Sequence, residues 1–268
     1  MKHLFLCTQA RTGSSLLLHL LQLGPIENHF STLDESIFNL EAFQYPQYAQ
    51  LKNLLGDRLN KYCVSHQCDP DRNFDPPFFK QFIAEYFQRF SHGNMVTVKW
   101  FPWGMAKFLR TLANRGIEIT PATLPEFFGD IAYIYLYRED LVRQTISRYI
   151  ARRTKQWWSN IEAQTELTPE TIPYDLGELM ETYQEFLHTE FIWNKRFQEF
   201  GVEPLYRFSY EELEGNYRDI LQTLSDKLKV KINLPEPGEI VLQKQTGELN
   251  EYLCERFLND LKKPVQSP

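Results

Sequence analysis

The stretch HLFLCTQARTGSSLLLHLLQLG (residues 3–24) joins a short apolar run to a polar turn and then to a leucine-rich segment. The apolar run predicts a buried strand over residues 3–8. The leucine-rich segment predicts a helix over residues 15–24, because Gly24 and the proline that follows it stop a helix. The turn QARTGSS, residues 9–15, therefore connects the end of a strand to the beginning of a helix.

The rest of the chain continues this alternation of apolar runs and amphipathic segments. We expect further strands over residues 95–101, 131–137 and 204–210. We expect helices over residues 78–90, 105–115, 138–153, 179–200 and 216–228, and helical character over 242–263. This order predicts the α/β class, as a P-loop-like three-layer sandwich with a mainly parallel central sheet and helices on both faces.

Length and composition are those of a folded globular protein. Of the 268 residues, 43% are hydrophobic and 24% are charged, which excludes a disordered or low-complexity chain. We expect a single domain over residues 1–268. Two loop-rich segments, at about 25–77 and 154–177, are where we expect a ligand to be recognised, and the second is a candidate lid.

The charge and cysteine content exclude several classes of partner. There are 29 Lys and Arg against 35 Asp and Glu, so the net charge of −6 provides no global field for nucleic acid, and an anionic ligand must be held by local groups. Four scattered cysteines do not suggest a disulfide scaffold, and we expect a cytoplasmic protein. No apolar run reaches the roughly 18 residues of a membrane span.

The turn after the first strand has the composition of an anion cradle. Gly13 permits a tight turn, and the amide groups at the beginning of the next helix are anion donors. Ser14, Ser15 and Arg11 add hydroxyl and guanidinium donors. The turn lacks the Gly-Lys-Ser/Thr of a nucleoside-triphosphate loop. The alternative is an ordinary serine-rich helix start.

A second set of donors follows the strand over residues 131–137. Arg138 stands at the exit of this strand, and Ser147 lies on the next helix. Since neighbouring parallel strands are about 5 Å apart, both can reach a second anion beside the first turn. For Arg143 and Arg148 the alternative is a solvated helix face balanced by Glu139 and Asp140.

These motifs resemble those of sulfotransferases that use 3'-phosphoadenosine 5'-phosphosulfate (PAPS). TQARTGSSLLLHLL is similar to their 5'-phosphosulfate loop, and YREDLVRQTIS to their 3'-phosphate segment. The ordered set most resembles the bacterial trehalose 2-sulfotransferase family, also described as lipopolysaccharide or nodulation-type sulfotransferases. Further segments of the set are LDESIF (33–38), VKWFPW (98–103), WNKRFQEFGVEPLYRFSYEEL (193–213) and LQKQTGELNEYLCERF (242–257).

The resemblance implies a role for each matching residue. Those that would hold the 5'-phosphosulfate are Arg11, Thr12, Gly13, Ser14 and Ser15. Arg11 would also stabilise charge on the bridging oxygen, while Arg138 and Ser147 would hold the 3'-phosphate. The catalytic base would be Glu35, with Asp34 as the alternative because LDESIF lacks the family's proline and first aromatic residue. The Tyr210–Leu213 segment (YEEL) resembles a family element whose simplest role is packing under this site.

Several other side chains have both a functional and a purely structural interpretation. Lys99, at a strand exit, is either a surface lysine or a cation that assists the reaction. The trio Cys63, His66 and Cys68 lacks the fourth ligand of a structural zinc site, so we expect no metal. Side chains that could pack in the core or touch a ligand are His19, His29, Trp100, Trp103, Trp157, Trp158, Gln245 and Thr246.

The resemblance implies transfer of a sulfuryl group from PAPS to a hydroxyl of a small molecule or glycan. It implies no nucleic-acid partner, and the family includes homodimers. A non-catalytic nucleotide- or glycan-binding protein on the same fold is the alternative, because of the departure around Glu35. A P-loop kinase is disfavoured because the turn has no lysine.

Overall fold

The structure is a computed structural model that describes residues 2–23, 30–32, 95–102, 113, 120, 123–154, 168–169, 171–232, 234–236 and 247–263. Its strands are β1 (Lys2–Cys7), β2 (Phe30–Thr32), β3 (Met95–Trp100), β4 (Asp130–Tyr137) and β5 (Tyr206–Ser209). Its helices are α1 (Ser14–Leu23), α5 (Leu124–Phe128), α6 (Leu141–Thr154), α7 (Leu176–Phe200), α8 (Tyr210–Leu228) and α9 (Glu248–Leu261). Strands and helices alternate along the chain, as the sequence predicts.

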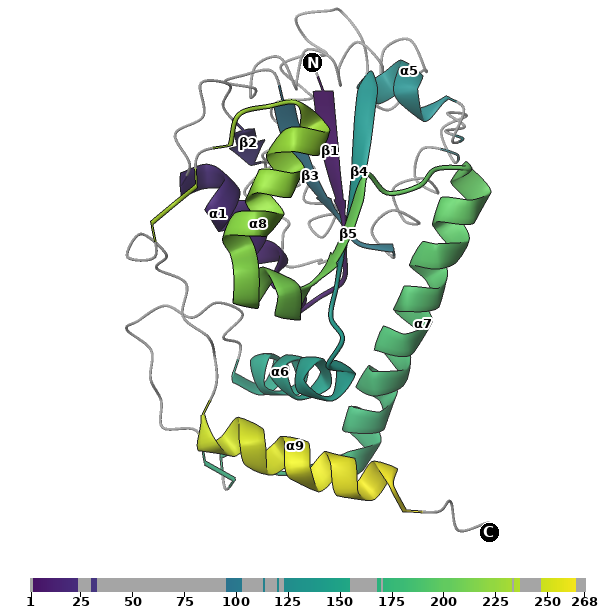
Figure 1. Cartoon of the computed structure of the whole chain (residues 1–268). Coiled ribbons are helices and arrows are strands. Elements are labelled where there is room, and N and C mark those ends of the chain that lie inside the picture. The colour runs from purple at the N-terminus through teal and green to yellow at the C-terminus, as the bar shows by residue number, and fades with distance from the viewer. Residues whose placement is uncertain are drawn as a thin grey trace, which may run out of the picture.

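The described strands form one parallel sheet in the order β2-β3-β1-β4-β5 (Figure 1). The first strand is therefore central, between β3 and β4. In this register Cys7 pairs with Trp100 on one side and with Tyr135 on the other. Because all strands run the same way, the loops that follow β1, β3, β4 and β5 meet at one edge of the sheet.

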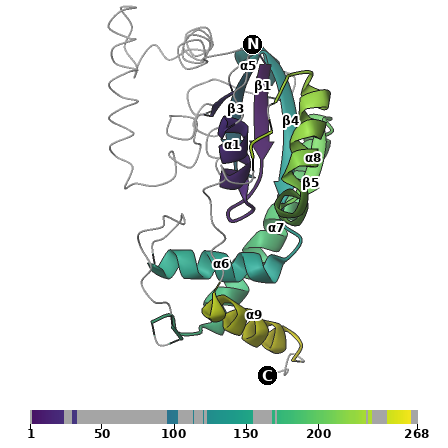
Figure 2. The same ribbon diagram turned by 60° about the vertical axis from the view of Figure 1, so that its left-hand side comes forward.

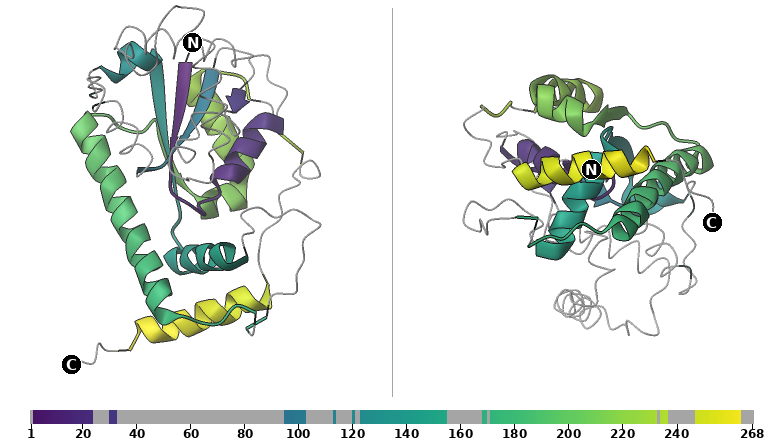
Figure 3. Two further views of the ribbon diagram at one scale, coloured as in Figure 1. Left: turned by 180° about the vertical axis from the view of Figure 1, so that it is seen from behind. Right: turned by 90° about the horizontal axis from the view of Figure 1, so that it is seen from below.

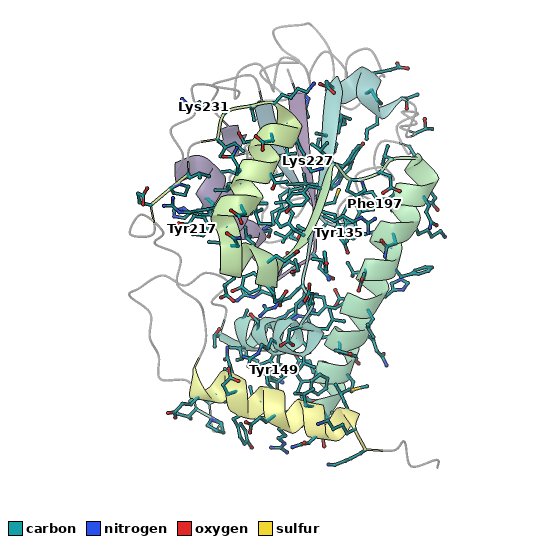
Figure 4. The ribbon with its side chains drawn as sticks, viewed as in Figure 1. Tyr135, Tyr149, Phe197, Tyr217, Lys227 and Lys231 are labelled. Carbon is teal, nitrogen blue, oxygen red and sulfur yellow. The ribbon has the colours of Figure 1, made fainter. Side chains whose placement is uncertain are left out.

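Helices cover both faces of the sheet. Leu4 and Leu6 belong to a buried cluster with the leucines of α1 and α8, whereas Phe5 projects from the other face, since side chains alternate along a strand. On that second face the rings of Tyr135 and Phe197 lie 5.6 Å apart, between the sheet and α7 (Figure 4). Seen from below, α8 and α7 lie on opposite sides of the sheet (Figure 3). The predicted three-layer sandwich is confirmed.

A second buried cluster lies beyond the carboxyl edge of the sheet. There α6 crosses below the strands and packs against α7 and α9 (Figure 2). Tyr149 lies between α6 and α9 (Figure 4), in a cluster that includes Ile146, Leu253 and Phe257. Burial of such side chains contributes about 1.5–3 kcal/mol each relative to exposure. This cluster fixes α6 opposite the loop that follows β1.

Several element boundaries differ from the prediction. The helix expected over residues 216–228 begins at Tyr210, and its residue Asn216 has the non-helical angles φ −149° and ψ 57°. The helix expected from 179 begins at Leu176, inside the segment predicted as a lid, and the one expected from 138 begins at Leu141. The sequence did not predict β2 or α5. The helices expected over 78–90 and, apart from residue 113, over 105–115 lie outside the described residues.

None of the described helices combines the length and apolarity required to cross a membrane. Within the same residues, no cluster of three or more His, Cys, Asp or Glu side chains could hold a metal ion.

Candidate functional site

The loop between β1 and α1 is held by hydrogen bonds to its carbonyl oxygens. Donors from α6, α7, α1, the β4–α6 junction and the loop itself each bind one of them. The pairs are Trp193 Nε1 to Thr8 O (2.9 Å), Thr12 Oγ1 to Gln9 O (2.9 Å), Gln144 Nε2 to Ala10 O (2.7 Å), Arg138 Nη1 to Arg11 O (3.1 Å) and Leu17 N to Gly13 O (3.0 Å). Amide groups in the first turn of a helix have no acceptor within it. The carbonyl oxygens of the loop are therefore occupied by donors from the protein. The amide groups at the beginning of α1 provide a positive partial charge.

Two residues of this loop have left-handed backbone angles. Arg11 has φ 65° and Gly13 has φ 74°. A Cβ atom on Gly13 would lie 2.4 Å from Cδ2 of Tyr210, so both the backbone angle and the neighbouring ring require glycine. For Arg11 the left-handed conformation costs on the order of 1 kcal/mol. Such strain is retained only where the surroundings fix the residue.

The surroundings of Arg11 join the two predicted anion-binding segments. Arg11 Nε donates a hydrogen bond to Ser147 Oγ at 2.9 Å, and Arg138 donates to the carbonyl oxygen of Arg11. Burial and the neighbouring charge of Arg138 lower the pKa of Arg11 from its ordinary value to about 10. Arg11 is thus charged at neutral pH, and its guanidinium group is close enough to that of Arg138 for the two charges to repel. An anion between these groups would reduce their repulsion.

The other predicted residues of the loop divide into two roles. Thr12 is fully buried, and its hydroxyl donates to Gln9 O and also hydrogen-bonds to the hydroxyl of Thr8. Its side chain therefore shapes the loop. Ser14 is buried and Ser15 half-buried, and they are the first two residues of α1, where donors favour an anion.

Lys99 is half-buried near the end of β3, and its Nζ lies 5.0 Å from the centroid of the Phe101 ring. Trp100 is 2% exposed and packs edge to face against Phe5, so its indole belongs to the core. His19 is half-buried on α1.

Arg143 and Arg148 of α6 pair with carboxylates of neighbouring helices, and Arg143 also with the expected Asp140. Arg143 forms a bidentate pair with Glu251 of α9, with Nη2 2.7 Å from Oε2, and also contacts Asp140. Arg148 pairs with Glu185 of α7 at 2.8 Å. The balancing carboxylates thus come mostly from α7 and α9, whereas the expected solvated face relied on Glu139 as well as Asp140. Exposed pairs of this kind contribute about 0–1 kcal/mol each.

Sequence reasoning missed Gln144 and gave the YEEL segment only a packing role. Gln144 is fully buried on α6 and binds the loop through Ala10, but a glutamine within an amphipathic helix gives no signal of that contact. Tyr210 contacts Gly13, and Glu211 lies 3.5 Å from Arg138, so the YEEL segment does more than pack beneath the site. The pattern Ser209-x-x-Glu212 is a capping box and could have placed the beginning of α8 at Tyr210.

Other predicted residues lie outside the described part of the chain. They are Asp34, Glu35, His29, Cys63, His66, Cys68, Trp103, Trp157, Trp158, Gln245 and Thr246.

Comparisons with known proteins were made against families, curated proteins and solved structures. The model of a family described as Stf0 sulphotransferase matches residues 104–260, which include Arg138 and Ser147 and exceed half of the chain. No curated protein matches. Among solved structures, the "Sulfotransferase Domain from the Curacin Biosynthetic Pathway" matches with 17% identity and a TM-score of 0.41, over 91% of this chain and 78% of that one.

Proposed function

Because the chain belongs to the Stf0 sulphotransferase family, we propose that it transfers a sulfuryl group from PAPS to a hydroxyl of a small molecule or glycan. One observation carries the choice of donor. The hydrogen bond from Arg11 to Ser147 joins the loop after β1 to α6, and Arg138 binds the same loop. A donor with phosphate groups at two positions requires two adjacent cationic sites, and this arrangement supports such a ligand.

The proposed division of the donor follows the two segments. The 5'-phosphosulfate would lie at the beginning of α1, on the amides of the first turn and the hydroxyls of Ser14 and Ser15. The 3'-phosphate would lie beside Arg138 and Ser147. Arg11, which is in contact with both segments, would stabilise the charge that develops on the bridging oxygen as the sulfuryl group leaves.

The proposed reaction is an in-line displacement at sulfur. The acceptor oxygen forms a bond to sulfur, while the bond between sulfur and the bridging oxygen breaks and its electron pair stays on the departing 5'-phosphate. The proton of the acceptor hydroxyl goes to the carboxylate of Glu35, or of Asp34 as the alternative. Lys99 at the end of β3 would add positive charge near the leaving group. Positioning and electrostatic stabilisation supply most of the acceleration, as in phosphoryl transfer, and the scheme uses no metal ion.

We further propose a single domain over residues 1–268, in which residues 25–77 and 154–177 supply the acceptor side of the site. Acceptor pockets are built from loops, so these segments are where the choice of hydroxyl would be made.

The proposal is tested by incubating the protein with PAPS labelled with ³⁵S and a panel of sugars and other alcohols. We expect label in an acceptor and release of 3'-phosphoadenosine 5'-phosphate, and Arg11→Ala should abolish both. Binding of the donor with no transfer to any acceptor class would favour a non-catalytic binding protein. Phosphoryl transfer from ATP with magnesium would contradict the proposal.

A further inference from the structure

The first two residues of α8 both contact Arg138. Ser209, the last residue of β5, pairs with Tyr137, the last residue of β4, so Tyr210 and Arg138 leave neighbouring strands side by side. The guanidinium carbon of Arg138 lies 4.6 Å from the centroid of the Tyr210 ring. Its Nε lies 3.5 Å from Oε1 of Glu211. One face and one edge of the guanidinium group are therefore in contact with α8.

The carboxylate of Glu211 also binds the chain directly before α6. It accepts hydrogen bonds from the backbone amides of Glu139 at 3.0 Å and Asp140 at 3.4 Å. Amides at the amino end of a helix lack acceptors within that helix, and they favour a negative charge. A single carboxylate thus accepts hydrogen bonds from the two peptide groups that follow Arg138 and forms an ion pair with the Arg138 side chain, without a hydrogen bond to its Nε.

The backbone of Glu211 lies within a turn that is fixed by a capping box. Glu212 N donates to Ser209 Oγ at 3.1 Å, and Ser209 N donates to Glu212 Oε2 at 2.6 Å. These reciprocal bonds define the first turn of α8. An arginine held by an already ordered carboxylate loses less freedom when it binds a ligand than one that must be ordered at that moment.

We propose that Glu211 is a positioning residue for the sulfate donor. Among the described residues, the Nε edge of Arg138 forms an ion pair with Glu211 and Nη1 donates to the carbonyl oxygen of Arg11, so we assign the donors of Nη2 to a phosphate. This inference rests on the proposed function, because it takes the ligand of Arg138 to be the 3'-phosphate.

If Glu211 acted only through its charge, its removal would change the affinity for the bisphosphate in the opposite direction. A carboxylate repels a phosphate bound nearby, and its removal would then strengthen binding. Positioning predicts that removal weakens binding, and that it does so only for a ligand that carries the 3'-phosphate. The two roles are therefore distinguished by the direction of the change.

The test compares 3'-phosphoadenosine 5'-phosphate with AMP, which lacks the 3'-phosphate, by titration calorimetry of the full chain. We expect Glu211→Ala to weaken binding of the bisphosphate by about tenfold and to change AMP binding by less than about twofold. Glu211→Gln keeps the shape of the side chain and an acceptor for the amides of Glu139 and Asp140. It should therefore reduce the affinity for the bisphosphate by less. In an Arg138→Ala background Glu211→Ala should have no further effect. The matched control is Glu236→Ala, which removes a carboxylate paired with Arg218 at 2.8 Å.

The possible results distinguish the assignment of the donor from the positioning role of Glu211. If the folded wild-type protein does not bind the bisphosphate, both the donor assignment and the role of Glu211 are wrong. If the wild type binds it and Arg138→Ala weakens binding, but both Glu211 variants bind as tightly or more tightly, only the positioning role is wrong. Equal losses for AMP and the bisphosphate would show a merely structural role and would also overturn it. Should Glu211→Ala fail to fold, the same comparisons apply to Glu211→Gln.

Discussion

Arg11 Nε donates a 2.9 Å hydrogen bond to Ser147 Oγ, across 136 positions of the sequence. The bond connects the loop that follows the central strand to the helix beyond the carboxyl edge of the sheet. Gln144, one turn before Ser147, binds the same loop at Ala10. The two segments that sequence motifs assign to opposite ends of one donor are therefore in direct contact, so a change in one should alter binding at the other.

The binding of the donor should depend on the protonation of Arg11. Its pKa is lowered to about 10, chiefly by burial and then by Arg138. A bound anion favours the protonated form, so affinity should be constant from about pH 7 to about pH 9 and fall as the pH rises through about 10. Calorimetry with 3'-phosphoadenosine 5'-phosphate across this range measures the profile. Arg11→Gln should lack the fall, and an identical fall in both proteins would contradict the assignment.

Substitution of Gly13 by alanine should destabilise the protein more than the same change at Gly201. Both glycines have positive φ, 74° and 59°, but only at Gly13 would a Cβ meet a ring, that of Tyr210. Left-handed strain costs about 1–2 kcal/mol at either site, and the contact adds about 1–3 kcal/mol at Gly13. Urea unfolding of the two variants measures the difference. Equal losses would show that the ring moves aside without cost.

Gln144→Leu should weaken both the fold and the site. The substitution leaves the half-buried carbonyl of Ala10 without its side-chain donor, which costs up to about 1–3 kcal/mol. The loop should then be less ordered, and donor binding should weaken. The control is Gln222→Leu, since Gln222 is exposed and its side chain donates a hydrogen bond to Asp226 of the same helix. Thermal unfolding and donor titration on both variants give the comparison; similar effects from the two would argue against a role for Gln144 in the loop.

Glu35→Gln should lose transfer and keep donor binding. A general base contributes about 10²–10⁴-fold to the rate, so the turnover number should fall by that factor. The same assay on Asp34→Asn distinguishes the two carboxylates, because only the variant of the true base should lose its rate. Full activity in both variants would contradict a carboxylate base in this segment.

The sequence predicted the sandwich because strand and helix patterns are local. Leu4 and Leu6 lie on one face of β1, and Phe5 and Cys7 lie on the other. Because both faces are apolar, β1 is buried within a sheet that is covered on both sides. The helix predicted from residue 216 begins six residues earlier, at Tyr210. The structure shows a kink at Asn216 within a helix that begins at the Ser209 cap.

The sequence predicted the residues of the site that belong to its motifs, but not the contacts between distant segments. Arg11, Gly13 and Arg138 follow from strand exits, since parallel strands bring those exits to one edge. The contacts of Tyr210 with Gly13 and of Glu211 with Arg138 depend on β5 lying beside β4, which single-strand patterns do not reveal. Pairings between distant segments arise from packing in three dimensions.

The most direct test of the account is the binding of 3'-phosphoadenosine 5'-phosphate by the purified wild-type protein, compared with AMP and with ATP plus magnesium. We predict that the bisphosphate binds at least about tenfold more tightly than AMP, because charge-assisted hydrogen bonds to the 3'-phosphate contribute about 1.5–3 kcal/mol each. Equal binding of AMP, preference for ATP with magnesium, or no binding of the bisphosphate by folded protein would contradict a PAPS-dependent sulfotransferase.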